Sequence, residues 1–288
     1  MNTSVISPAL QIGLVKLRIS QLERSLTYYT EVIGLKILRQ DHKTADLTAD
    51  GHTVLLQLEE IENAKILPRQ SVAGLYHFAI LVPDRTSLGL VLRNLAVRNQ
   101  QIGQGDHLVS EALYLYDPDN NGIEIYADRP RSTWQKDERG QYIMATDPVD
   151  VDGLLALAEG KEWTGLPAGT IIGHVHFHVP TLAAARQFYV DTLGFEIVLT
   201  DDRSVLFISA GGYHHHLGLN VWAGVGAPVA PADAVGISYY TLKMPDQASI
   251  QEVAHRARAA GIPVEEKEGQ LWLTDPSHIQ VRFYSDAS

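Results

Sequence analysis

The chain has 288 residues, of which 45% are apolar, and this is enough material for two ordinary hydrophobic cores. Its 23 Lys and Arg residues stand against 34 Asp and Glu, for a net charge of −11 without a basic run, which argues against nucleic acid as a partner. The absence of cysteine excludes disulfides, thiolate nucleophiles and Cys-ligated metals, and it fits a reducing compartment. Any metal must therefore be bound by His and carboxylate side chains.

The apolar runs, such as LYHFAILV, have the length of a strand rather than of a membrane span. No basic segment followed by an apolar stretch stands at the N-terminus. We therefore expect a soluble, cytoplasmic protein with no membrane partner.

A weak repeat of roughly fifty to seventy residues occurs four times along the chain. Each copy opens with an apolar or alternating segment that predicts a strand. These segments are LVKLRIS at 14–20, HFAILVP at 77–83, HVHFHVP at 174–180 and YYTLKMP at 239–245. We call the four copies modules one to four.

A helix is predicted after each of these strands. The stretches 22–35 and 182–195 match position by position, each with a Gly near its end, and are the best evidence for duplication. Helices are also expected at about 84–98 and 246–260, and modules two and four close with a DP turn and a strand at 117–128 and 275–286. Each module is predicted to be βαβββ, which gives an α+β protein.

The stretch 129–170 matches none of the modules, and we interpret it as an interdomain connection with one short helix. Modules one and two would then form a domain over 10–128, and modules three and four a second over 171–286. The LERSL-x-YY-x-x-x-x-GL helix and the DP-x-x-NGIEIY ending resemble the glyoxalase, bleomycin-resistance and extradiol dioxygenase superfamily. The resemblance covers nearly the whole chain and implies paired modules whose sheets curl into half-barrels around a metal.

In this superfamily the metal-facing positions lie on the first and last strands of each module. On the first strands, the position six residues before the closing Pro or Ser is Leu14, His77, His174 and Tyr239. On the last strands, the seventh residue after the Asp of the DP turn is Glu124 in module two and Arg282 in module four. Modules two and three therefore carry the metal-binding side chains.

This distribution predicts that modules two and three pair, within one chain or between two, and bind a metal with His77, Glu124 and His174. Modules one and four would form a companion half-barrel without metal. Two His and one carboxylate with open positions suit Fe(II) oxygen chemistry, and Mn(II) could bind the same set. Against this stands the interpretation that each His is a hydrogen-bonded core residue, in a half-barrel that binds a ligand without metal.

Further residues match the extradiol dioxygenases in particular. Tyr114 stands ten residues before Glu124, as in that family, and His107 corresponds to a His that opens the same strand, although its spacing is about two residues shorter. The pattern His-x-Leu-Gly-Leu selects His215 as an essential catalytic residue, whereas a glyoxalase-like register selects His216. We keep both, with His215 first.

The stretches GLYHFAIL, VSEALYL, NGIEIYADRP and GGYHHHLGLN are similar to those of bacterial two-domain catechol 2,3-dioxygenases. The resemblance implies cleavage of a catechol by O₂ to a 2-hydroxymuconic semialdehyde, with His215 or His216 passing a proton and Tyr114 and His107 orienting the substrate. A glyoxalase-like isomerase or lyase, and a binding or resistance protein without turnover, are the alternatives. The oligomeric state and the ring substituents stay open.

Overall fold

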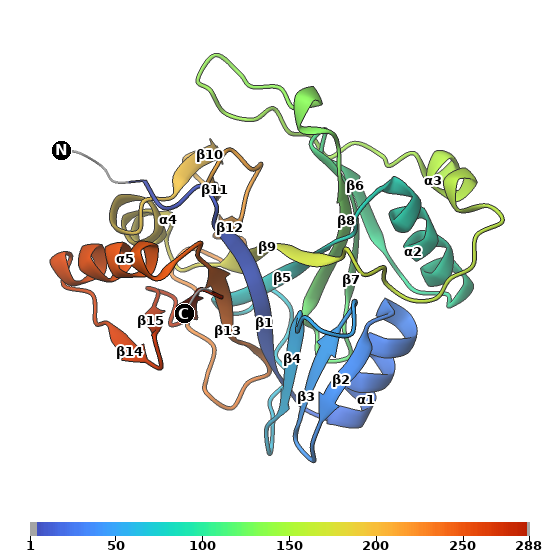
Figure 1. The fold of residues 1–288 in the computed structure, drawn as a ribbon, viewed down its shortest axis with the longest axis horizontal. Helices are drawn as coiled ribbons and strands as arrows, with labels where there is room; N and C mark the ends of the chain where they lie inside the picture. The colour runs from blue at the N-terminus through green and yellow to red at the C-terminus, as the bar shows by residue number, and fades with distance from the viewer. Residues whose placement is uncertain (1–4, 287–288) are drawn as a thin grey trace.

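Two eight-stranded sheets form the body of the protein in a computed structural model, which describes residues 5–286 (Figure 1). One sheet has the strand order β14-β15-β16-β13-β1-β4-β3-β2, and the other has the order β10-β11-β12-β9-β5-β8-β7-β6. The first sheet takes its strands from modules one and four, and the second takes them from modules two and three. The predicted α+β class and the predicted pairing of modules are both confirmed, and the pairing occurs within one chain.

Each module has the predicted βαβββ order of elements. Module one contains β1 (Gln11–Ile19), α1 (Leu22–Thr27), the π-helix η1 (Tyr28–Ile33), β2 (Lys36–Gln40), β3 (Thr44–Thr48) and β4 (Leu56–Glu60). Module two contains β5 (Gly74–Leu81), α2 (Arg85–Val97), β6 (Gly103–Asp106), β7 (Ser110–Tyr116) and β8 (Gly122–Asp128).

Modules three and four repeat the same order. Module three contains β9 (Ile171–His178), α4 (Leu182–Arg186), the π-helix η3 (Gln187–Thr192), β10 (Glu196–Thr200), β11 (Val205–Ser209) and β12 (Leu217–Asn220). Module four contains β13 (Gly236–Lys243), α5 (Gln247–Ala259), β14 (Glu265–Lys267), β15 (Gln270–Thr274) and β16 (Gln280–Tyr284). The intervening stretch holds a 3₁₀ turn, η2 (Arg131–Thr133), and the expected short helix, α3 (Val151–Ala158).

The helices expected over 22–35 and 182–195 are each an α-helical segment that continues as a π-helical turn. Both end at a glycine in the left-handed region, Gly34 with φ of 90° and Gly194 with φ of 88°. Only glycine adopts this conformation without a steric cost, and it stops the helix so that the next strand can begin. Gly34 follows η1 directly and Gly194 follows η3 after one further residue, and these similar ends support the duplication.

The strands that meet at the middle of each sheet are the first strands of its two modules. β5 and β9 run antiparallel with Ala79 opposite His174, and β1 and β13 run antiparallel with Lys16 opposite Tyr239. Each first strand is flanked on its other side by the parallel last strand of its own module. This arrangement brings the first and last strands of two modules together at the centre of one curled sheet.

A single apolar core joins the two sheets. Phe177 of β9 packs on Tyr240 of β13 with ring centroids 5.3 Å apart, and Phe78 of β5 lies 6.5 Å from the Tyr29 ring. Since side chains alternate along a strand, the residues next to Phe78 in β5 and next to Phe177 in β9 point to the opposite face of their sheet. The helices lie outside the strands, with α4 and α5 on one side of the molecule and α1, α2 and α3 on the other (Figure 1). No helix within residues 5–286 is long and apolar enough to cross a membrane.

Candidate metal centre

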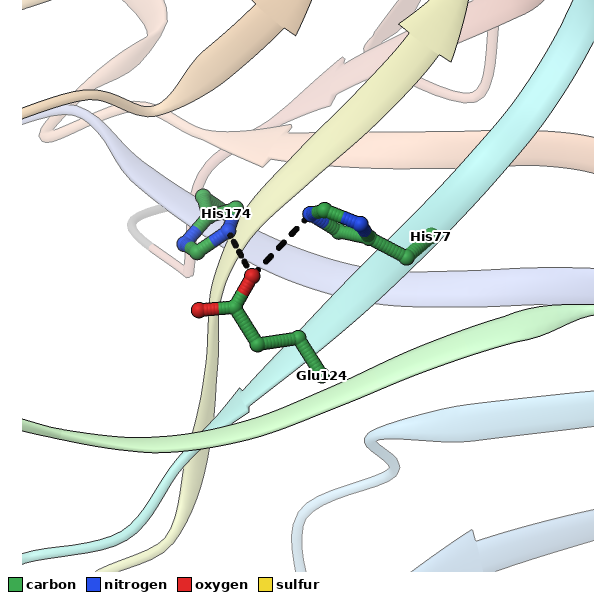
Figure 2. Close-up of side chains that lie close together, drawn as sticks. All are labelled: His77, Glu124 and His174. Atoms are coloured by element: carbon green, nitrogen blue, oxygen red, sulfur yellow. Dashed lines mark hydrogen bonds and ion pairs between the residues drawn. The ribbon is translucent and has the colours of Figure 1, made fainter. Parts of the chain in front are cut away.

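Three side chains from three adjacent strands converge at the middle of the second sheet (Figure 2). His77 comes from β5, His174 from β9 and Glu124 from β8. The Nε2 atoms of both histidines lie 3.1 Å from Oε2 of Glu124, and all three residues are buried. The three residues predicted to bind metal are therefore brought together.

The geometry of this group fits a metal ion. The ligand atoms of the three residues all lie within 4.8 Å of one another. An ion about 2.1 Å from each ligand requires neighbouring ligand atoms roughly 3–3.5 Å apart, which agrees with the two contacts of 3.1 Å. His77 Nε2 is buried and has no hydrogen-bond partner, so one nitrogen that faces the carboxylate is left for another ligand or an ion.

The protonation states that the surroundings favour also suit a metal. Burial disfavours the ionised form of Glu124, but the neighbouring imidazoles of His174 and His77 outweigh this effect and hold the pKa of Glu124 well below its ordinary value. Burial lowers the pKa of His77, against the pull of Glu124. A carboxylate beside a neutral imidazole is the form that coordinates a divalent ion.

A cavity of about 590 Å³ opens from this group toward solvent. Its polar wall is made by His77, Glu124, Tyr114, His107, His176 and His215, and its apolar wall by Tyr76, Val109, Met144, Leu199, Val205, Phe207 and Trp222. A volume of this size accommodates a small aromatic molecule. Tyr114, His107 and His215, which were predicted to act on the substrate, all line the cavity.

Tyr114 and His107 form a hydrogen-bonded pair. His107 Nδ1 lies 2.7 Å from the carbonyl oxygen of Ala145, which can only accept a hydrogen bond, so Nδ1 carries the proton. The other nitrogen, Nε2, is then an acceptor, and the Tyr114 hydroxyl donates to it over 2.7 Å. Burial and the charge of Glu124 raise the pKa of Tyr114 well above its ordinary value, so the phenol stays protonated.

His215 is oriented by a second hydrogen-bonded chain. His214 Nε2 donates to Asp128 Oδ1 over 2.9 Å, which leaves His214 Nδ1 as the acceptor of the 2.8 Å hydrogen bond from His215 Nδ1. His215 Nε2 is therefore unprotonated and available to the cavity. Burial, followed by the neighbouring His174 and His214, lowers the pKa of His215 well below its ordinary value and keeps the ring neutral.

His216, the second residue selected on this segment, does not line the cavity. Its Nδ1 lies 3.0 Å from Ser209 Oγ and accepts a hydrogen bond from the Ala210 backbone over 3.2 Å. His214, His215 and His216 lie in a bend before β12. The choice of His216 assumed that these residues belong to a regular strand. Of the two predicted residues, the structure therefore favours His215, which lines the cavity, over His216, which does not.

One histidine of this cavity, His176, and a second that is linked to it, His178, were not predicted from the sequence. His176 lines the cavity with its ring centroid 4.9 Å from that of His77, and its Nε2 accepts a hydrogen bond from Asn220 Nδ2 over 2.9 Å. Oδ1 of Asn220 lies 2.6 Å from Nδ1 of His178. The alternation in HVHFHV was the available signal, because residues 174, 176 and 178 share one face of a strand.

His176 also explains a glycine in module three. Gly218 stands opposite His176 on β12, as Glu124 stands opposite Ala79 on β8. A Cβ atom at Gly218 would lie 2.7 Å from Cγ of His176, which is too close for the two to coexist without a shift. Module three therefore contributes imidazoles from its first strand and has no side chain at the last-strand position that corresponds to Glu124.

The comparison with known proteins agrees with this geometry. The family model of the Glyoxalase/Bleomycin resistance protein/Dioxygenase superfamily matches residues 11–125 and 171–283. The chain belongs to this superfamily. It is 54% identical over 266 residues to "Catechol-2,3-dioxygenase" of Bacillus subtilis (strain 168), covering 92% of this chain and 93% of that protein.

Two solved structures with low sequence identity share the fold. A candidate dioxygenase from Bacillus subtilis subsp. subtilis str. 168 has a TM-score of 0.66 at 11% identity, over 98% of this chain and 86% of that one. Glyoxalase I from Zea mays has a TM-score of 0.55 at 15% identity, over 96% of this chain and 92% of that one. These two structures agree in fold, and the family model together with the 54% identical relative confirms the resemblance to the superfamily.

Proposed function

We propose that this protein is an Fe(II)-dependent extradiol dioxygenase that cleaves a catechol with O₂ to a 2-hydroxymuconic semialdehyde. The observation that carries the proposal is the buried group of His77, Glu124 and His174, of which His77 and Glu124 line a cavity together with Tyr114, His107 and His215. The 54% identity to a catechol-2,3-dioxygenase supports the same reaction. Both atoms of O₂ enter the product, so no external reductant is needed.

The metal would be held by one carboxylate and two imidazoles from three neighbouring strands. Two His and one carboxylate leave coordination positions open for a substrate and for O₂. When bound there, Fe(II) supplies the redox chemistry with O₂ and the positive charge that favours loss of the phenolic protons. Mn(II) suits the same donors, so loading with each metal is part of the test.

Tyr114 and His107 would hold the substrate and accept a proton from it. The Tyr114 hydroxyl donates to His107 Nε2, so its oxygen can accept a hydrogen bond from a catechol hydroxyl in the cavity. Transfer of the substrate proton to the Tyr114 oxygen, with passage of the phenol proton to His107 Nε2, leaves Tyr114 neutral throughout. This agrees with a phenol whose pKa lies well above its ordinary value because of burial.

His215 would act from the side of module three. Its ring centroid lies 4.1 Å from that of His174, and its free Nε2 can take up a proton in the cavity. The proton on Nδ1 is held by His214, which is itself held by Asp128. Asp128 and His214 thus position His215 and set which nitrogen acts, although neither lines the cavity.

The experiment is reconstitution of the purified protein with Fe(II) or with Mn(II) under anaerobic conditions, followed by catechol and air. We expect O₂ uptake equal to the catechol consumed and a yellow ring-opened product with at least one of the two metals. A protein that binds the metal but takes up no O₂ with catechol would refute the proposal. An isomerase or lyase of the same superfamily would bind metal without consuming O₂, so the same measurement separates it.

A further inference from the structure

A second cavity of about 590 Å³ lies at the junction of the two sheets, apart from the metal group. Its wall includes the starts of β5 and β13 and the two linkers that precede them, 61–73 and 221–235. The linkers are joined by an ion pair of 2.6 Å between Lys65 Nζ and Asp233 Oδ2 and by a hydrogen bond of 2.8 Å from the Ala73 backbone to Pro228. The cavity is therefore a built feature of the fold that both halves of the sequence complete.

The charge of this cavity is opposite to that of the protein. The chain as a whole carries a net charge of −11, yet no Asp or Glu stands among the residues that line the cavity. Its ionisable lining consists of the arginines Arg18 and Arg69, the histidines His178 and His278, and the tyrosines Tyr76 and Tyr116. A cationic wall in an anionic protein attracts small anions from solution and disfavours cations.

Neither arginine has an acidic partner within residues 5–286. Arg69 lies 3.5 Å above the centroid of the Tyr116 ring, and its Nε donates to Asn120 Oδ1 over 3.2 Å, so the planar group is fixed in orientation. Arg18 Nε is buried without a hydrogen-bond partner. The acidic residue whose charge acts on Arg18 is Glu59, which is bound to Lys16 at 2.8 Å. Two guanidinium groups thus have donors to spare, and a carboxylate is the partner that matches their geometry.

The cavity also shares a wall with the one that holds the metal group. Tyr76 lines both, and its ring centroid lies 4.9 Å from that of His178 on one side and 4.8 Å from that of His77 on the other. Carbon-rich side chains such as Leu75, Ile237 and Ile279 complete the lining. A ligand in this cavity is therefore in contact with apolar surface as well as with arginine.

We propose that this cavity binds a small organic carboxylate through Arg18 and Arg69. The two arginines supply the charge, and the apolar part of the wall favours a carbon chain over a fully hydrated inorganic ion. The products of extradiol ring cleavage belong to this chemical class, because the cleaved ring ends in a carboxylate. That link rests on the proposed function, but the binding itself requires no turnover.

The test is isothermal titration calorimetry of the metal-loaded protein with muconate, an unsaturated six-carbon dicarboxylate, and separately with inorganic phosphate. We expect muconate to bind and Arg69→Gln to weaken it about tenfold or more, because a charge-assisted hydrogen bond is lost. Arg18→Gln should weaken it by a similar factor. Arg139→Gln, which removes an exposed arginine of the 129–170 connection, is the matched control and should leave binding unchanged.

Three results would overturn the inference. These are no detectable binding of muconate, equal affinity in Arg69→Gln and the unchanged protein, and phosphate binding as tight as muconate. Arg69 is exposed, so its replacement leaves the core intact even if that of Arg18 does not. Since O₂ uptake with catechol is measured separately, failure of muconate binding leaves the proposed function standing.

Discussion

The two sheets have the same order of strands and the same register, yet within residues 5–286 only the sheet of modules two and three carries a group of side chains that could bind a metal. Tyr239 and Leu14 of modules four and one take the places of the two histidines, and Arg282 takes that of the carboxylate. The structure agrees with this equivalence. Glu124 stands opposite Ala79, which is two residues after His77 on β5, and Arg282 stands opposite Thr241, which is two residues after Tyr239 on β13.

In the companion sheet these positions make an aromatic and cationic cluster instead. Trp272 stands opposite Arg282, as Tyr114 stands opposite Glu124. The Arg282 guanidinium lies 5.3 Å from the Tyr239 ring and 5.6 Å from the Trp272 ring, within reach of cation–π attraction. The comparison teaches that the fold accepts either set of side chains, and that a few residues decide whether a half-barrel can bind a metal.

Replacement of Glu124 on β8 should have the largest effect on metal binding and on O₂ uptake. Glu124→Gln removes the carboxylate ligand, so we expect the metal to be lost and O₂ uptake with catechol to fall by more than about 100-fold, beyond the loss seen for supporting residues around metals. Metal content measured by mass spectrometry checks this. Arg282→Gln is the control and should retain the metal, and equal loss in both variants would contradict the assignment of the site to one sheet.

Replacement of Tyr114, which stands opposite Glu124, should lower turnover without loss of the metal. Tyr114→Phe removes the hydroxyl that donates to His107, and we expect kcat to fall roughly 100-fold, the lower end for loss of a proton-transfer group, with full metal content. Trp272→Phe at the equivalent place should leave kcat within about twofold of the original, since it lies outside the cavity. Steady-state O₂ uptake measures both, and a similar loss in the two variants would count against the role of Tyr114.

The two halves of the sequence share one feature that can be tested. The DP turn of each half holds a buried carboxyl group, Asp117 in one and Asp275 in the other. Burial raises the pKa of Asp117 and that of Asp275 to about 6 each. Since these values exceed that of the unfolded chain, near 3.9, the folded state binds more protons between pH 4 and 6, and stability falls as the pH rises through that range. Each carboxyl accounts for about 2 kcal/mol of the loss over this range.

Urea unfolding at pH 4 and pH 7 provides the measurement. The stability of the unchanged protein relative to Asp117→Asn should decrease by about 2 kcal/mol from pH 4 to pH 7, and Asp275→Asn should behave alike. The pH-independent cost of the substitution cancels in this difference. A difference that does not vary with pH would show that neither carboxyl titrates in the folded state.

The smallest effect concerns the hydrogen bonds that join the modules of each half. Tyr29 of module one donates to Asp117 over 2.8 Å, and Tyr189 of module three donates to Asp275 over 2.9 Å. Replacing either by Phe should lower the free energy of unfolding by about 1.5–3 kcal/mol, because the acceptor is a buried carboxyl. Tyr189 also accepts a hydrogen bond from Tyr240, so Tyr189→Phe should cost more than Tyr29→Phe in urea unfolding. A larger loss of stability for Tyr29→Phe than for Tyr189→Phe would indicate that the Tyr29–Asp117 and Tyr189–Asp275 hydrogen bonds are not equivalent.

Much of the fold and the three proposed ligands could be predicted because the repeat supplies its own register. The Pro and Ser that end the first strands and the Asp of the DP turns mark the same positions in different modules. Residues at these positions face the same side of a strand, since side chains alternate with a period of two. The chemistry at those positions then indicated which modules pair, because only one pairing unites two imidazoles with a carboxylate, and this pairing is the one found.

The sequence by itself thus determined the modules, their order, their pairing and the three residues that we propose as ligands. The tertiary structure alone decided which of His215 and His216 faces the cavity, because the three histidines lie in a bend, where alternation gives no direction. It also brought Asp128 and His214 into one hydrogen-bonded chain with His215, and it placed Arg18 and Arg69 in the wall of the same cavity. These are contacts between residues far apart in the chain, set by how the two sheets pack, and no local periodicity encodes them.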